Sequence, residues 1–151
     1  MSQKLPLDTL IELAQNKADE ATRRLGQLQS AHNSAAEKLE LLHRYRQEYL
    51  DQLQTHLQEG VSAAHLRNFR QFISTLDTAI EQQHALTTQA DARLVHGRSD
   101  WQHTRSRLNS FDTLAERVQL QQAVAENKRA QRDSDEHTAR QFYRRSNASA
   151  G

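Results

Sequence analysis

Apolar residues recur along the chain at alternating steps of four and three residues, through two long segments. A repeat of 3.5 residues kept over many turns is typical of helices whose apolar seams face each other in a coiled coil. The pattern therefore predicts one helix over about 6–58 and a second over about 63–135. The seam of the first helix consists of Leu7, Ile11, Ala14, Ala18, Ala21, Leu25, Leu28, His32, Ala35, Leu39, Leu42, Arg46, Tyr49 and Leu53. The seam of the second consists of Leu66, Phe69, Ile73, Leu76, Ile80, Gln83, Thr87, Ala90, Leu94, Gly97, Trp101, Thr104, Leu108, Phe111, Ala115, Val118, Gln122 and Ala125.

A short connection over about 58–62 separates the two segments. Gly60 can adopt the left-handed conformation that ends a helix, and Ser62 is a candidate N-cap of the next one. At the start of the chain, Pro6 and Asp8 are helix-start signals. Because the connection is short, the helices are expected to fold back on each other. The sequence therefore predicts an all-α fold, a single domain formed by a long two-helix antiparallel coiled-coil hairpin.

The two seams can be paired by placing the turn near residue 61. Leu25 then faces Gly97, so that a large residue meets a small one and the seam fills without overpacking. Three polar residues of the second seam are interpreted as setting this register or packing next to Ala, namely Gln83, Thr87 and Thr104.

The first helix is shorter than the second. On the register above, it ends opposite Ala115. The rest of the second helix therefore has no partner within the chain, and we expect it to protrude as a single C-terminal helix. A disordered tail is expected over about 140–151, where small and charged residues dominate.

The composition fits few long helices better than a globular fold. Hydrophobic residues make up 36% of the chain and charged residues 26%, and with only 4 Gly and 1 Pro there is little material for turns. The net charge of +1 lacks the basic excess of nucleic-acid-binding proteins. There is no Cys, no apolar run typical of a signal peptide, and no stretch approaching the roughly 18 apolar residues of a membrane-spanning helix. We therefore expect a cytoplasmic protein with no transmembrane segment and no nucleic-acid partner.

The sequence contains no recognisable catalytic or metal-binding motif. A Gly-rich phosphate loop, a His-Glu-x-x-His pattern and a nucleophilic Cys are all absent. No two His residues stand four apart, and His96 and His103 are two helical turns apart, too far for easy chelation. A two-helix fold also offers no deep pocket. We therefore expect a protein that is not an enzyme and that binds no metal, cofactor or small-molecule ligand.

Some apolar residues lie beside the seam rather than on it. Phe72, Ala79 and Leu86 recur every seven residues, next to the seam residue Leu76. On the first helix, Tyr45 lies beside Leu42 and Tyr49 in the same way. Such a surface either binds a partner, as contiguous exposed apolar groups usually do, or simply flanks the coiled-coil core.

Residues 126–145 form a second candidate region, in which basic residues outnumber acidic ones. The basic residues are Lys128, Arg129, Arg132, Arg140, Arg144 and Arg145. Phe142 and Tyr143 lie among them as apolar anchors. The segment either becomes ordered inside a partner or is a solvated tail with no specific role.

Several of these segments resemble the FliJ family of flagellar export proteins. They are LIELA at 10–14, ADEA at 18–21, LG at 25–26, YRQEY at 45–49 and FRQFISTLDTAIEQ at 69–82, with Trp101 in addition. The resemblance covers about residues 7–125. It implies a cytoplasmic component of the type III export apparatus, peripheral to the inner face of the cell membrane at the flagellar base. It also implies a stalk-like coiled coil similar to the gamma subunit of rotary ATP synthases.

The partners that this resemblance implies are the export ATPase (FliI-like), the export gate protein (FlhA-like) and export chaperones. Its partner-binding positions fall on Leu42, Tyr45, Tyr49, Phe72, Leu76 and Ala79. Because the chain termini of the family enter the ATPase ring, Arg129, Arg132, Phe142 and Tyr143 are candidate ring contacts. The run from Phe142 to Arg145 itself matches no family motif.

Two other interpretations remain open from the sequence. The chain could be a self-associating scaffold or adaptor, in which two hairpins form a four-helix bundle through the Phe72 stripe. Alternatively, the basic residues of 126–145 could form an arm that binds nucleic acid.

Overall fold

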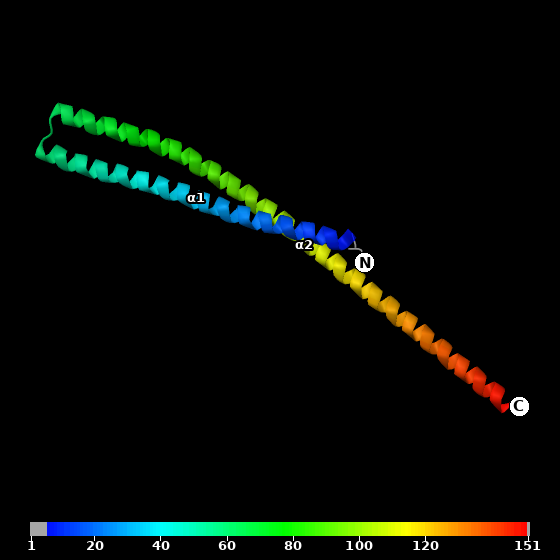
Figure 1. The fold of residues 1–151 in the computed structure, drawn as a ribbon. Helices are drawn as coiled ribbons and strands as arrows, with labels where there is room; N and C mark the ends of the chain where they lie inside the picture. The colour runs from blue at the N-terminus through cyan, green and yellow to red at the C-terminus, as the bar shows by residue number, and fades with distance from the viewer. Residues whose placement is uncertain (1–5, 151) are drawn as a thin grey trace. The chain divides into compact units, whose positions relative to one another are not determined.

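A computed structural model describes residues 6–150, which form two α-helices and contain no strand. Helix α1 spans Pro6–Glu59 and helix α2 spans Ala63–Ser149. Next to the turn that joins them, the two helices lie side by side and their chains run in opposite directions (Figure 1). The all-α antiparallel hairpin predicted from the sequence is therefore confirmed. The chain divides into two units, Asn16–Arg105 and a second one formed by residues 6–15 and 106–150.

The turn between the helices uses the two residues that the sequence indicated. Gly60 has φ of 95°, a left-handed conformation that residues with a Cβ rarely adopt. Ser62 then caps α2, because its Oγ accepts a hydrogen bond from the backbone N–H of His65 at 3.2 Å. The carbonyl of Ser62 accepts the first helical bond, from the N–H of Leu66 at 3.0 Å. These bonds satisfy donors that a helix start would otherwise leave without partners.

Within the unit Asn16–Arg105, every predicted seam position is buried or half-buried. Ala18, Phe69, Leu76 and Leu94 are each no more than 7% exposed, and Gly97 is buried as well. The intervening surface positions are mostly exposed, as expected for two helices that shield only one stripe of each other. The core of this unit is therefore a single narrow seam along the hairpin.

Interhelical contacts establish the register of the hairpin. The Oγ1 of Thr87 donates to the carbonyl of Ala35 at 3.2 Å, and the Nε2 of Gln83 donates to the same carbonyl at 3.1 Å. Leu25 lies next to Gly97, with its Cδ1 at 3.9 Å from the place that a Cβ of Gly97 would occupy. The pairing of Leu25 with Gly97 is thus confirmed. Two polar seam residues are satisfied by one backbone acceptor on the opposite helix.

The unit formed by residues 6–15 and 106–150 shows the same type of packing over a short length. Ala14 and Leu108 are its most buried residues, at 5% and 6% exposure. From residue 119 to its end at Ser149, every residue of α2 is exposed. This part of α2 is therefore covered by no other described part of the chain.

The C-terminal end of α2 differs from the sequence-based expectation. We expected the helix to end near 135 and a disordered tail over about 140–151, whereas α2 continues to Ser149; residue 151 lies outside the described residues. The physical reason is that no Gly or Pro occurs between Gly97 and Gly151, so nothing in the backbone stops the helix. Low hydrophobicity predicted the lack of tertiary contacts, but not the secondary structure.

Candidate functional site

Aromatic side chains from both helices meet on the surface of the unit Asn16–Arg105. The rings of Tyr49 on α1 and Phe72 on α2 have centroids 4.2 Å apart and are tilted by 31°. Tyr49 also packs against Phe69, with centroids 5.2 Å apart. Phe69 is only 7% exposed, whereas Phe72 is 41% exposed. Phe72 therefore leans on Tyr49 and remains accessible to a partner.

The other predicted partner-binding residues extend this contact along each helix, and we call the whole set the hairpin patch. It consists of Leu42, Tyr45, Tyr49, Phe72, Leu76 and Ala79. Steps of three, four and seven residues place the members on one face of each helix. Tyr45 is 48% exposed, and Leu42 and Ala79 are half-buried. Leu76 is only 7% exposed, so it belongs to the seam beneath the patch and offers little surface of its own.

An ion pair crosses the hairpin within the patch, and sequence reasoning missed it. The Nε of Arg46 lies 2.6 Å from Oδ1 of Asp77. Arg46 interrupts the apolar seam of α1, and the register places it next to Asp77 on α2. The pairing could have been found from that register. Because both side chains are partly exposed, we expect the pair to position the helices more than to stabilise them.

A second feature missed by sequence reasoning lies nearer the turn. The rings of His56 on α1 and His65 on α2 have centroids 5.6 Å apart. Both also contact Phe69, at centroid distances of 5.5 and 5.0 Å. Phe69 is thus surrounded by Tyr49 and two imidazoles. This explains why it is buried although it lies close to the end of the hairpin.

Further exposed apolar residues continue the surface away from Phe72. Leu86, which the sequence placed on the same stripe, is 54% exposed. Leu41 on α1, which sequence reasoning did not single out, is 39% exposed. Each helix of this unit therefore exposes at least one further large apolar residue beyond the hairpin patch.

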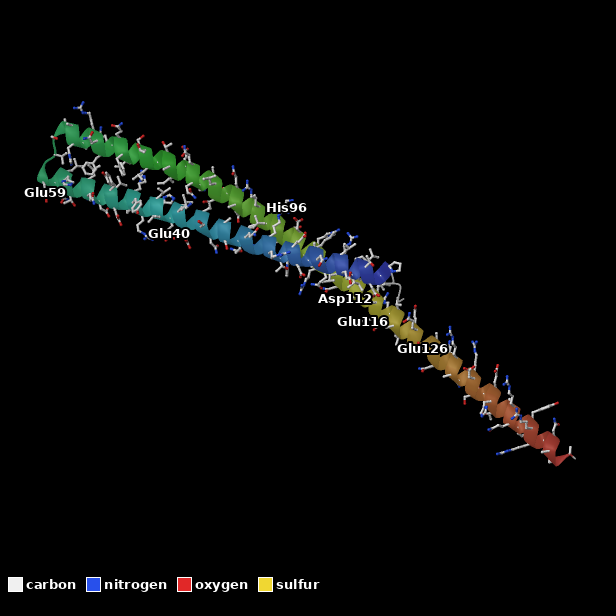
Figure 2. All side chains as sticks on the ribbon, viewed as in Figure 1. Glu40, Glu59, His96, Asp112, Glu116 and Glu126 are labelled. Atoms are coloured by element: carbon white, nitrogen blue, oxygen red, sulfur yellow. The ribbon has the colours of Figure 1, made fainter. Side chains whose placement is uncertain are left out.

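The predicted ATPase-contact residues all lie in the exposed part of α2. Phe142 is 75% and Tyr143 is 69% exposed, and Arg129 and Arg132 are exposed as well. Beyond Glu126, side chains stand off the helix in all directions (Figure 2). Packing within the described chain therefore gives no reason for aromatic residues at these two positions.

The remaining sequence-based expectations concern metals and membranes. Among residues 6–150, no three His, Asp or Glu side chains are grouped so that they could hold a metal ion. Neither described helix contains a window apolar enough to cross a bilayer.

The chain is similar along nearly its whole length to proteins of one family. The family model of the Flagellar FliJ protein matches residues 3–147. The Flagellar FliJ protein of Salmonella typhi is 33% identical over 145 residues, 96% of this chain and 99% of that protein. The Flagellar FliJ protein of Escherichia coli (strain K12) is 30% identical over the same shares. The solved structure of CT670, a YscO-like protein of Chlamydia trachomatis, shares the fold, with a TM-score of 0.51 and 12% identity over 95% of this chain and 96% of that one.

Proposed function

Because the chain belongs to the flagellar FliJ family and is a component of flagellar type III protein export, we propose that it acts as a non-catalytic, stalk-like coiled coil. It binds the export ATPase ring, the export gate protein and export chaperones from the cytoplasmic side of the membrane at the flagellar base. The observation that carries this proposal is the hairpin patch. It presents an accessible aromatic residue, Phe72, at the position where the family resemblance implies a partner contact.

The geometry of Phe72 supports a role in binding the export gate. Binding energy is usually concentrated in a few aromatic or Arg residues that are ordered before the partner arrives. Phe72 is held by Tyr49 at 4.2 Å and still exposes 41% of its surface. Little side-chain entropy is therefore lost when a partner covers it.

The exposed part of α2 supports a separate role in binding the ATPase ring. Phe142 and Tyr143 are largely exposed on a segment that also carries Arg129 and Arg132. Exposed aromatic and Arg side chains on a helix that lacks intramolecular contacts are typical of a segment that inserts into a partner. The protein itself catalyses no reaction. It favours one arrangement of the ring by binding it more tightly than the others.

The experiment that tests this division of labour measures two affinities by titration calorimetry. The full chain is titrated separately with the purified cytoplasmic domain of the export gate and with the export ATPase. We expect Phe72→Ala to weaken gate binding at least tenfold and to leave ATPase binding unchanged. Phe142→Ala is the matched control and should do the reverse. The proposal would be contradicted if the Phe72→Ala variant still bound the gate with unchanged affinity. It would also be contradicted if each variant lost affinity for both partners.

Folding of the variants has to be measured in parallel. Phe72→Ala removes a half-exposed ring, and we expect a loss of about 1 kcal/mol, in the range of an aromatic pair. Phe69→Ala removes a buried ring and should lower the free energy of unfolding by about 3 kcal/mol or more. If Phe72→Ala destabilises as much as Phe69→Ala, Phe72 is a core residue and the patch is not a binding surface.

Self-association is the second candidate function, and the exposure of Phe72 and Leu86 favours it. Two hairpins could bury these side chains in a four-helix bundle. Sedimentation equilibrium distinguishes the two functions. A tight dimer that Leu86→Ala and Phe72→Ala both dissociate would support the scaffold, and a monomer at micromolar concentration would exclude it.

A further inference from the structure

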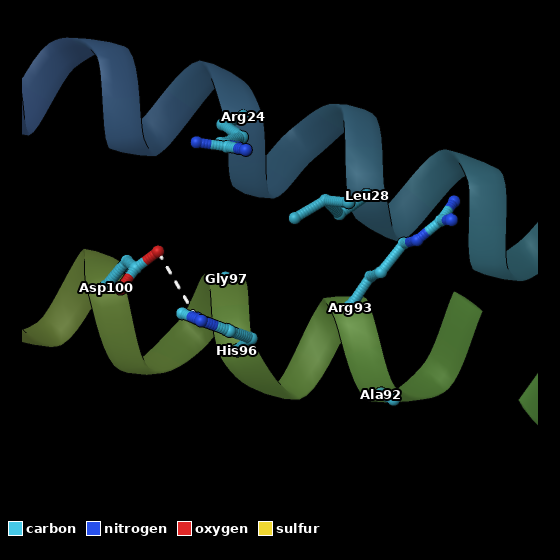
Figure 3. Close-up of a pocket in the computed structure, with 7 residues that line it drawn as sticks. All are labelled: Arg24, Leu28, Ala92, Arg93, His96, Gly97 and Asp100. Atoms are coloured by element: carbon cyan, nitrogen blue, oxygen red, sulfur yellow. Dashed lines mark ion pairs between the residues drawn. The ribbon is translucent and has the colours of Figure 1, made fainter. Parts of the chain in front are cut away.

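The unit Asn16–Arg105 has a second surface feature, about seven turns of α2 from Phe72. Two adjoining cavities of about 400 and 340 Å³ share Arg24, Gly97 and Asp100 in their walls. Figure 3 shows the residues that line the larger of the two. We call this feature the Gly97 groove. It was not among the sites expected from the sequence, because its residues are spread over both helices.

The groove exists because Gly97 has no side chain. Leu28 Cδ1 lies only 2.5 Å from the position that a Cβ of Gly97 would occupy, so Leu28 packs directly against the backbone of α2. Half-buried Ala21 lines one of the two cavities and exposed Ala92 lines the other. The result is a shallow apolar trough rather than the filled ridge of side chains found elsewhere along a coiled coil.

The rim of the groove is basic. Arg24 projects from α1 and Arg93 from α2, with Leu28 between them (Figure 3). Lys17 lines the adjoining cavity. Among the residues that the structure describes, none of these three cations forms an ion pair.

Acidic residues also line the groove, but they balance the cations only in part. Asp100 is engaged by His96, whose Nδ1 lies 3.4 Å from its Oδ2 (Figure 3). Glu20 is the second carboxylate in the walls. The three cations Lys17, Arg24 and Arg93 therefore outnumber the two carboxylates by one.

We propose that the Gly97 groove binds a short amphipathic helix of a partner protein. An apolar side chain of that helix lies over Leu28 and Gly97, and its Asp or Glu residues pair with Arg24 and Arg93. A guanidinium forms paired hydrogen bonds with a carboxylate, which gives this recognition both direction and strength. Small residues in the floor allow a third helix to approach closely, as in a three-helix bundle. The proposal does not depend on the function proposed for the hairpin patch.

Other occupants fit the groove less well. It is too open to enclose most of a small molecule's surface, which specific small-molecule binding requires. Nucleic acid is held mainly by many cations along a phosphate backbone. Here three cations surround an apolar floor that phosphates would leave unused. An apolar residue flanked by carboxylates uses both the apolar floor and the cations of the rim.

The test uses the full-length chain and two labelled helical probe peptides. The first peptide carries Leu at helical spacing and flanking Glu residues, and in the second every Glu is replaced by Gln. Fluorescence anisotropy should show that the Glu peptide binds at least tenfold more tightly than the Gln peptide. The double variant Arg24→Glu with Arg93→Glu should lower the affinity for the Glu peptide at least tenfold. The matched control Arg67→Glu with Arg70→Glu, which changes the charge equally outside the groove, should leave it unchanged.

The location of binding can be read directly, because the chain has only 4 Gly. With glycine-selective ¹⁵N labelling, addition of the Glu peptide should shift the amide signal of Gly97 and leave that of Gly60 in place. Equal binding of the two peptides, equal losses in the two double variants, or a shift confined to Gly60 would each overturn the proposal. So would single-stranded DNA that displaces the peptide at the same concentration.

Discussion

Two glycines lie inside helices of this chain, and their surroundings predict opposite outcomes for the same substitution. At Gly26, apart from its chain neighbours and the adjacent backbone of its own helix, no atom lies within 4 Å of the place that a Cβ would occupy, whereas at Gly97 the Cδ1 of Leu28 lies 2.5 Å away. In a helix interior, Ala is favoured over Gly by about 1 kcal/mol. Gly26→Ala should therefore stabilise the chain by nearly that amount.

Gly97→Ala should gain the same helix propensity but must also displace Leu28. Overpacking of a filled seam costs about 1–3 kcal/mol, and the flexible end of the Leu side chain places this case near the lower limit. We therefore expect Gly97→Ala to be neutral or destabilising, and at least about 1 kcal/mol less stable than Gly26→Ala. For a chain of this length, that difference corresponds to about 2–4 °C in melting temperature.

The measurement is urea and thermal unfolding of both variants, followed by circular dichroism at one protein concentration. The difference between the two variants removes the contribution of helix propensity and leaves the cost of moving Leu28. If Gly97→Ala stabilises as much as Gly26→Ala, the helices do not approach each other closely at Gly97. The description of the Gly97 groove would then be wrong as well.

Three further predictions test other parts of the fold. Ser62→Ala removes the cap of α2 and should lower the free energy of unfolding by about 1 kcal/mol; an unchanged urea midpoint would show that the cap does not matter. Asp77→Ala breaks the pair with Arg46 and should cost less than about 1 kcal/mol, with an effect that shrinks in 1 M salt; a larger, salt-independent loss would indicate a packing role. A chain that ends at residue 118 should melt within a few degrees of the full chain, since residues 119–150 are exposed throughout; a large drop would reveal contacts beyond those described.

The seam of the hairpin could be predicted from the sequence because burial in a coiled coil follows from spacing alone. Every seam position from Leu7 to Val118 is buried or half-buried, and Gln122 and Ala125 are exposed. The pairing of Leu25 with Gly97 followed from the position of the turn. By contrast, the predicted end of α2 was wrong. The composition of residues 126–150 indicates that this segment does not pack against other parts of the chain, but it does not indicate whether the segment is helical.

The surface features were harder to predict, because they depend on side chains from both helices at once. The sequence showed that Phe72 lies beside the seam. Predicting its stacking on Tyr49 would have required the axial offset between the two helices. The Arg46–Asp77 pair and the His56–His65–Phe69 cluster required the same information. The Gly97 groove depends on the missing side chain of one residue and on Leu28 of the other helix.

The exposed stretch of α2 over residues 119–149 is expected to move faster than the paired part of the hairpin. Only hydrogen bonds within the helix hold it in shape, and an isolated helix of this size opens and re-forms within about a microsecond. Its amide protons therefore exchange with solvent orders of magnitude faster than those around Ala18 or Leu94, which are released only when the hairpin opens. A partner that captures this stretch meets a segment that samples many bent and frayed shapes, and can select among them without disturbing the paired helices.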